Sequence, residues 1–334
     1  MTLNQFIYRM SRPLGGLKLA KFLSRKHPKI LMYHRITDDP NGEGLTADQF
    51  RQQVRIIKRD FVPMTLRDLL KAHEDGKVPE NAVVVTFDDG YADFAEVAFP
   101  ILRDESVPVT LFITAGFVNG DLWLWPDKLK YIINRCDSKE PVFLEGLKRS
   151  YDVYKDRERF WHDVSDYCLT LKNSTKEHYI EKVSQDLGVE IPVVPPSNFR
   201  PLSWKSLEYL IDQGVDVGSH SYSHPILKKL DHNELVDEVV RSNRLIETKL
   251  NFTPNVFCYP NGREIDYDEN VQKVLEANGY DYAVTAFPSR MPLKNKMEIC
   301  RYPVNSSIDI FLKTVFGLTY LGMGGWLSWI KENT

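Results

Sequence analysis

Short apolar runs alternate with amphipathic segments along most of this 334-residue chain. Runs such as 83–85 and 109–113 predict buried strands, because consecutive apolar residues bounded by turn residues are typical of parallel sheets. Between them, segments such as 47–58 and 66–73 place apolar residues at helical spacing. Strands that alternate with helices in this way predict an α/β fold built on a parallel sheet or barrel.

Two adjacent carboxylates, Asp88 and Asp89, stand directly after the apolar run 83–85 and before Gly90. In barrels and open α/β sheets, chemistry sits at the carboxyl ends of the strands. Neighbouring carboxylates repel each other, and their burial is costly unless a cation or hydrogen bonds compensate. One carboxylate on a metal and the other free as a base resolves this conflict. A plain Asp-Gly turn is the alternative.

Two of the eight histidines, His220 and His224, follow another apolar run at 215–217. Gly218 before them and Pro225 after them argue against a regular helix, so we expect a tight loop that aims both rings inward. Two imidazole nitrogens and one carboxylate oxygen leave a catalytic metal open positions for water. Such a pair is often incidental on its own, but the Asp-Asp strand end favours a metal site.

A third strand end, Phe257-Cys258-Tyr259-Pro260-Asn261-Gly262, closes with Pro and Gly turn signals. Together the three motifs resemble the polysaccharide deacetylase family, carbohydrate esterase family 4, with its nodulation-type deacetylase domain. The family's Thr-Phe-Asp-Asp-Gly is present letter for letter at 86–90, and its His-Ser-x-x-His form matches 220–224. The resemblance runs from about residue 30 to about residue 304.

This resemblance implies a metal-dependent N-deacetylase on an α/β fold, a distorted (β/α)7-type barrel. Asp89, His220 and His224 would bind one divalent metal, most often zinc, and Asp88 would be the general base that takes a proton from the attacking water. The metal and backbone N–H groups around Tyr259 would stabilise the tetrahedral oxyanion.

The general acid departs from the common family pattern, because no histidine follows His232 and the usual Leu-x-His motif is therefore missing. A permuted subgroup, which includes biofilm poly-N-acetylglucosamine deacetylases, supplies this acid from its first strand. His34, after the apolar run from Ile30, resembles that acid; a core or surface histidine is the alternative. We expect Arg301 to hold Asp88 ionised in place of the usual third-motif arginine, unless it is an ordinary surface residue.

The pattern changes between about 116 and 201, where segments rich in Lys, Glu and Asp predict helices around 127–136, 156–171 and 175–187. We interpret this stretch as an inserted helical subdomain over the mouth of the site. Its tryptophans either stack on sugar rings or, as we favour, belong to the core: Trp123, Trp125 and Trp161.

Charge is unevenly distributed along the chain. The net charge of −3 implies no general affinity for nucleic acid, yet residues 1–29 carry seven basic residues and no acid. The basic residues are Arg9, Arg12, Lys18, Lys21, Arg25, Lys26 and Lys29. The four cysteines are widely spaced, which indicates reduced thiols rather than a disulfide framework or a zinc cluster.

Three regions follow from these patterns: a basic segment at 1–29, the deacetylase-like barrel at 30–310 and an apolar segment at 311–334. Residues 1–29 lack the continuous apolar core of a secretory signal. We therefore expect a cytoplasmic protein. Peripheral contact of both termini with the inner face of the membrane is a hypothesis.

The sequence predicts a hydrolase that removes N-acetyl groups from an amino sugar in a glycan, a glycolipid or a sugar nucleotide. Hydrolysis of another non-peptide C–N bond, in a small amide or a cyclic ureide, is the alternative within enzymes. A catalytically silent glycan-binding protein is the alternative outside them. The presence of both carboxylates, the histidine pair and His34 argues against the silent protein.

Overall fold

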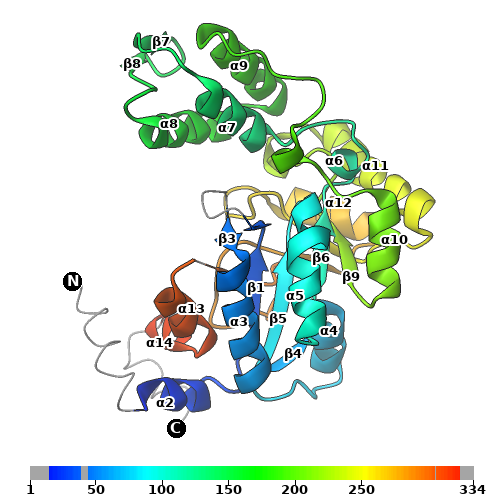
Figure 1. Ribbon diagram of the computed structural model, residues 1–334. Coiled ribbons are helices and arrows are strands. Elements are labelled where there is room, and N and C mark those ends of the chain that lie inside the picture. Colours follow the sequence, from blue (N-terminus) through cyan, green and yellow to red (C-terminus); the bar gives the residue numbers. More distant parts are fainter. Residues whose placement is uncertain (1–14, 39–43, 305, 324–334) are drawn as a thin grey trace.

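A computed structural model describes residues 15–38, 44–304 and 306–323 (Figure 1). Within these residues, eight strands form one sheet in the order β11-β10-β9-β6-β5-β1-β12, with β4 paired to the first half of β5. Every pairing in the sheet is parallel. The strands are β1 (Lys29–Tyr33), β4 (Val62–Met64), β5 (Ala82–Phe87), β6 (Thr110–Ile113), β9 (Asp216–Ser219), β10 (Val256–Cys258), β11 (Tyr282–Val284) and β12 (Tyr302–Pro303).

The sheet curls so that its two edges approach each other. Within the described residues β11 and β12 do not pair directly, but Ile299, three positions before β12, forms a parallel bridge with Val284 of β11. Helices pack around the sheet (Figure 1). They are α3 (Ala47–Asp60), α4 (Leu66–Glu74), α5 (Phe99–Asp104), α6 (Ala115–Val118), α10 (Trp204–Asp212), α11 (His232–Leu250) and α12 (Glu269–Ala277). This arrangement confirms the predicted distorted β/α barrel.

Side chains of β5 alternate between two apolar clusters, as the period of a strand requires. Val83, Val85 and Phe87 join the cluster shared with α3 and α5, whereas Ala82 and Val84 join the cluster shared with α4. All six residues of the strand are buried. A strand that is covered on both faces explains why its sequence is a continuous apolar run.

The stretch between β6 and β9 contains the helices α7 (Trp125–Arg135), α8 (Arg157–Thr170) and α9 (Asn173–Asp186), close to the predicted segments. A hairpin that we did not predict joins α7 to α8, with strands β7 (Val142–Leu144) and β8 (Arg149–Tyr151). These elements share their own apolar cluster, which includes Trp125, and Figure 1 shows them standing over one end of the barrel. Trp123 stacks on Phe199 and is also buried, so both tryptophans belong to the core.

Two segments at the ends of the described chain lie beside each other. Helix α2 (Gly16–Leu23) contacts α13 (Ile308–Val315) and α14 (Leu318–Gly322). Phe311, Leu312 and Val315 enter the main core, so the described part of the predicted C-terminal segment packs against the barrel. The predicted termini at 1–14 and 324–334 lie outside the described residues. Among those that are described, no helix is both long and apolar enough to cross a membrane.

Candidate active site

One cavity of about 580 Å³ is lined by all seven predicted site residues. Six of them follow the carboxyl ends of β1, β5, β9 and β10, because a parallel sheet places these ends along one edge, whereas Arg301 directly precedes β12. The lining residues are His34, Asp88, Asp89, His220, His224, Tyr259 and Arg301.

Three buried side chains converge on one point in this cavity. The Nε2 atoms of His220 and His224 lie 3.5 and 3.6 Å from Oδ1 of Asp89. This buried oxygen has no hydrogen-bond partner, although an isolated buried carboxylate is costly. Two ligand atoms that are each about 2.1 Å from a tetrahedral zinc ion lie about 3.4 Å apart. The spacing and the unpaired oxygen therefore fit a bound cation.

An unusual backbone conformation places Asp89 in this position. Asp89 has a φ of 76° and Gly90 a φ of 91°, in the left-handed region that non-glycine residues rarely adopt. A Cβ atom at Gly90 would lie 3.0 Å from Val118, so glycine fits both the conformation and the space. The turn after β5 thus separates the directions of Asp88 and Asp89.

The second ring nitrogen of His220 fixes the orientation of the imidazole. Its Nδ1 lies 2.8 Å from the carbonyl oxygen of Cys258, which can only accept, so we assign the proton to Nδ1. The Nε2 lone pair then faces Asp89, as in metal sites where the outer nitrogen donates to a carbonyl. Burial lowers the pKa of His220 to about 4 and that of His224 well below its usual value. Both rings are therefore neutral, as metal ligands must be.

Asp88 has a different environment, although it is the next residue in the chain. The Arg301 guanidinium donates to its Oδ1 at 2.6 Å and to its Oδ2 at 2.8 Å, and the Arg301 Nε donates to the Thr285 carbonyl. Burial alone would raise the pKa of Asp88, but the charge and hydrogen bonds of Arg301 more than offset it and hold this pKa below its usual range. Asp88 is therefore ionised.

Asp89 lacks such a partner, and its pKa lies well above its usual value because of burial first and the charge of Asp88 second. A cation beside Asp89 would reverse this shift, since an opposite charge favours the ionised carboxylate. Two neighbouring carboxylates in environments this different can take different roles, one as a ligand and the other as a base.

His34 lies on the other side of Asp88, with its Nε2 3.9 Å from Oδ2 of that carboxylate. Its side chain is 46% exposed, so it faces the open part of the cavity. Desolvation lowers the pKa of His34, while the Asp88 charge works in the opposite direction. The His34 imidazole and the Asp88 carboxylate therefore line the same cavity, close enough for both to contact one substrate.

Tyr259 lines the cavity, but its own backbone N–H points into the sheet. Its N–H donates to the Val284 carbonyl of the neighbouring strand at 3.1 Å. Its hydroxyl donates to the Met297 carbonyl at 3.0 Å, and its ring stacks on Tyr267. The pairing between β10 and β11 therefore continues through Tyr259 and occupies its own N–H, and the role of the other backbone N–H groups around this residue stays a prediction.

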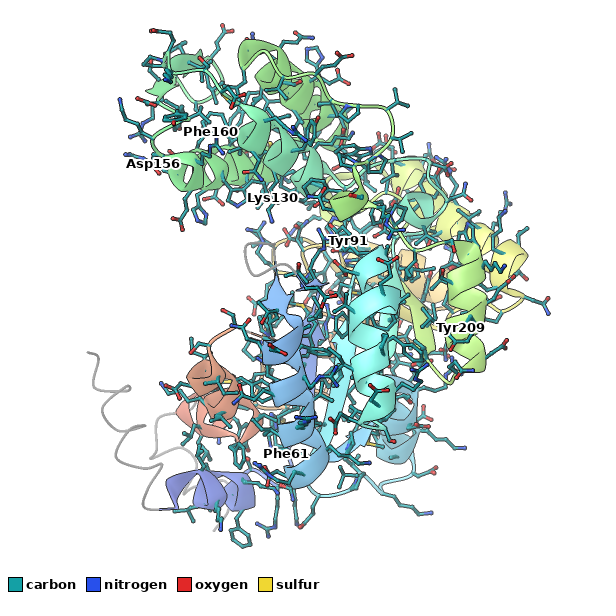
Figure 2. All side chains as sticks on the ribbon, viewed as in Figure 1. Phe61, Tyr91, Lys130, Asp156, Phe160 and Tyr209 are labelled. Carbon is teal, nitrogen blue, oxygen red and sulfur yellow. The ribbon has the colours of Figure 1, made fainter. Side chains whose placement is uncertain are left out.

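Several residues in and around the cavity escaped sequence reasoning. The Cys258 thiol, buried behind the cavity, donates to Asp88 at 3.6 Å and accepts from Arg301 at 3.1 Å. Tyr91 donates to the buried Asp127 of the insert at 2.8 Å. In Figure 2, Tyr91 at the top of the barrel and Lys130 under the insert lie on facing sides of the opening, and both line the cavity.

The insert thus forms one wall of the site. A larger hollow of about 670 Å³ lies against α9 and residues 121–123, and it contains none of the predicted site residues.

The four cysteines are free and buried, which agrees with the predicted reduced thiols.

Solved structures share this fold. A Streptococcus pyogenes deacetylase, PplD, and IcaB from Ammonifex degensii each cover 87% of this chain, with a TM-score of 0.56 and 17% identity. The match covers 96% of each of those chains. At this identity the likeness concerns the fold alone.

Sequence similarity is higher over a shorter region. A stretch of 106 residues, 31% of this chain, is 35% identical to the poly-beta-1,6-N-acetyl-D-glucosamine N-deacetylase of Staphylococcus aureus. The match spans about a third of the length of that relative. The sequence pattern of the polysaccharide deacetylase family, in contrast, matches residues 75–139 and 166–283, more than half of the chain. The chain therefore belongs to the polysaccharide deacetylase family.

Proposed function

We propose that this protein hydrolyses the N-acetyl group of an amino sugar with the help of one divalent metal. The observation that carries the proposal is the convergence of Asp89, His220 and His224 beside the ionised Asp88–Arg301 pair in one open cavity. The named Staphylococcus aureus relative is a deacetylase of an acetylated glucosamine polymer, which supports this reaction class.

Two histidine nitrogens and one carboxylate oxygen favour zinc among the common metals, because imidazole suits zinc better than it suits magnesium or calcium. Three protein ligands are also the number that catalytic zinc sites use, since they leave a position open. When bound, such an ion would polarise the acetyl carbonyl and make a neighbouring water more acidic.

Two residues carry the two proton transfers of the reaction, Asp88 as the general base and His34 as the general acid. Asp88 is ionised and accepts the proton of the attacking water, while Arg301 fixes the plane of its carboxylate through two hydrogen bonds. His34 donates a proton to the departing nitrogen, because an unprotonated amine anion is a poor leaving group.

The contact between these two groups couples the transfers. Desolvation lowers the pKa of His34, and the negative charge of Asp88 opposes this shift. Once Asp88 has accepted a proton, this charge is lost, and His34 becomes a stronger acid at the stage when the nitrogen needs its proton.

The cavity wall suits a polar ligand such as a sugar. Arg35, Asp127, Lys130 and Arg263 place charges of both signs around the opening, and none of its lining residues is a tryptophan. We propose an amino sugar in a glycan, a glycolipid or a sugar nucleotide as the substrate. A small amide or cyclic ureide would leave much of the 580 Å³ cavity unfilled.

The test combines metal content with acetate release from N-acetylated glucosamine oligomers. Asp89→Ala should lose the metal, and Asp88→Ala should keep the metal but release no acetate. An active Asp88→Ala variant would contradict the assigned base. Metal binding with glycan affinity but no acetate release would instead favour the silent glycan-binding protein.

We also propose that helix α2 contacts an anionic membrane surface, at the inner face if the protein is cytoplasmic as predicted. Leu19 and Phe22 are 59% and 58% exposed, and the exposed Lys18 and Lys26 lie close to them in the chain. An apolar face beside basic residues is the pattern of interfacial helices. Helix α2 precedes β1, whose other end leads to His34, so the site would face away from this surface (Figure 1).

Sedimentation with phosphatidylserine-containing vesicles at low salt tests this contact. A Leu19→Glu/Phe22→Glu double variant should remain in the supernatant. An Ile265→Glu variant changes another exposed apolar residue, which is 66% exposed, and should pellet like the unchanged protein. The idea fails if the unchanged protein does not pellet with these vesicles.

A further inference from the structure

The loop that carries both histidines rests on a single buried carboxylate of helix α11. Oε1 of Glu238 accepts hydrogen bonds from the backbone N–H groups of Tyr222 at 2.9 Å and Ser223 at 2.5 Å. Its Oε2 accepts from the Ser223 hydroxyl at 2.9 Å. Glu238 is only 8% exposed, so these bonds replace the water that the carboxylate loses.

The loop needs such support because its backbone is strained. Ser221 and His224 have φ values of 67° and 58°, and left-handed conformations of non-glycine residues persist only when the surrounding structure holds them. Between these two positions lie Tyr222 and Ser223, whose N–H groups both point to Glu238. One carboxylate thus satisfies the two donors at the centre of the turn.

The opposite side of the loop is held by helix α6. The N–H groups of Ala115 and Gly116 donate to the carbonyls of Ser221 and Tyr222 at 3.0 and 2.9 Å. A Cβ atom at Gly116 would lie 2.7 Å from the Tyr222 oxygen, so this approach requires glycine. The loop is therefore clamped between the backbone of α6 and one side chain of α11.

We propose that Glu238 is a positioning residue that sets the metal affinity of the site. It does not line the cavity, and its hydrogen bonds to Tyr222 and Ser223 reach the loop rather than either imidazole. Its effect passes through the backbone of 221–224, which leads from His220 to His224 and sets the position of the His224 ring beside Asp89. The inference rests on the proposed function only for the identity of the site as a metal centre.

Loss of the Glu238 carboxylate should weaken metal binding more than it weakens catalysis by the loaded protein. Removal of groups that support metal ligands typically costs 10–100-fold in affinity. Glu238 does not line the cavity, so KM and the kcat at saturating zinc should stay close to those of the unchanged protein. A residue with a merely structural role would lower thermal stability without this selective change.

The experiment measures the zinc dissociation constant by competition with a chromophoric chelator, in the absence of substrate. Glu238→Ala should bind zinc about 10–100-fold more weakly. Glu238→Gln keeps an oxygen for the two N–H groups and should lie nearer to the unchanged protein. Val239→Ala is the matched control, because Val239 is the next residue of α11 and is buried without a polar contact to the loop.

Unchanged zinc affinity in Glu238→Ala, or an equal loss in Val239→Ala, would overturn the proposal. If Glu238→Ala does not fold, Glu238→Asp takes its place: the shorter side chain keeps the charge but withdraws it from the loop, and unchanged affinity there overturns the proposal as well. A chain that binds zinc but releases no acetate would contradict the deacetylase function and leave the role of Glu238 intact. A chain without zinc affinity would overturn both.

Discussion

Arg301 holds both carboxylate oxygens of Asp88, at 2.6 and 2.8 Å, although 213 positions separate the two residues in the chain. Both side chains are almost completely buried. A buried ion pair depends on good geometry and on further hydrogen bonds, and Arg301 has both, since it also donates to Thr285 and Thr86. The pair joins the end of β5 to the start of β12.

Arg301→Gln should destabilise the fold as well as the reaction. It leaves the Asp88 charge buried without its partner, which typically costs about 3–5 kcal/mol in the free energy of unfolding. Urea unfolding measures this loss. The double variant Asp88→Asn/Arg301→Gln removes both charges and should recover much of the stability, whereas equal losses in the single and double variants would contradict the argument.

His34→Asn should affect amide and ester substrates differently. An amide needs its leaving nitrogen protonated, so we expect acetate release from an N-acetyl sugar to fall about 10²–10⁴-fold. An activated aryl acetate has a leaving group that needs no proton, and its hydrolysis should fall much less. Steady-state rates on both substrates check this, and an equal loss on both would remove His34 from the role of acid.

Zinc should stabilise the unchanged protein but not Asp89→Ala. A ligand that binds only the folded state at a hundredfold excess over its Kd adds about 2.7 kcal/mol to the free energy of unfolding. Treatment with a chelator followed by zinc addition should therefore raise the Tm of the unchanged protein. If Asp89→Ala showed the same rise, the stabilising ion would have to bind elsewhere.

Lys29 predicts a pH dependence of stability that is independent of the metal. It is fully buried, its amine donates to Ser24, and burial followed by the charge of Lys21 lowers its pKa to about 7. Between about pH 7 and pH 10 the unfolded chain therefore binds a proton that the folded chain does not. The free energy of unfolding should rise with pH in this window, by up to about 1.4 kcal/mol per pH unit, and should be lowest below pH 7.

Lys29→Met provides the comparison. It removes the titrating group, so the difference in unfolding free energy between the two proteins should change in favour of the unchanged protein as the pH rises from 7 to 10. The hydrogen bonds lost to Ser24 shift this difference by an amount that the pH changes little. A difference that stays constant across the window would show that Lys29 keeps an ordinary pKa.

The residues that line this cavity were predictable where a polar residue follows an apolar run. Asp88, His220 and His34 are all of this kind, and the parallel sheet brings the ends of such runs together. The N–H of Tyr259 was not predictable in this way, because no local signal in the sequence shows that it continues the pairing with β11.

Other features depend on contacts that only the folded chain creates. Glu238 is one of several charged residues in an amphipathic helix, and the sequence around it does not indicate that the loop at 221–224 packs against it. Asp127 lies in the insert, and its role in the cavity wall follows from how the insert packs on the barrel. The hairpin β7–β8 is too short for its alternation to be recognised.

The pairing of β1 with β12 brings together two cavity residues, His34 and Arg301, that the family pattern does not cover. The family pattern covers 75–139 and 166–283, which contain both aspartates and both histidines of the pair but neither His34 nor Arg301. These two residues follow β1 and precede β12, which lie side by side in the sheet. A fragment bounded by the family pattern would therefore keep Asp88, Asp89 and the histidine pair but lose His34 and Arg301. Exchange of this strand pair between relatives would transfer His34 and Arg301 together as one unit.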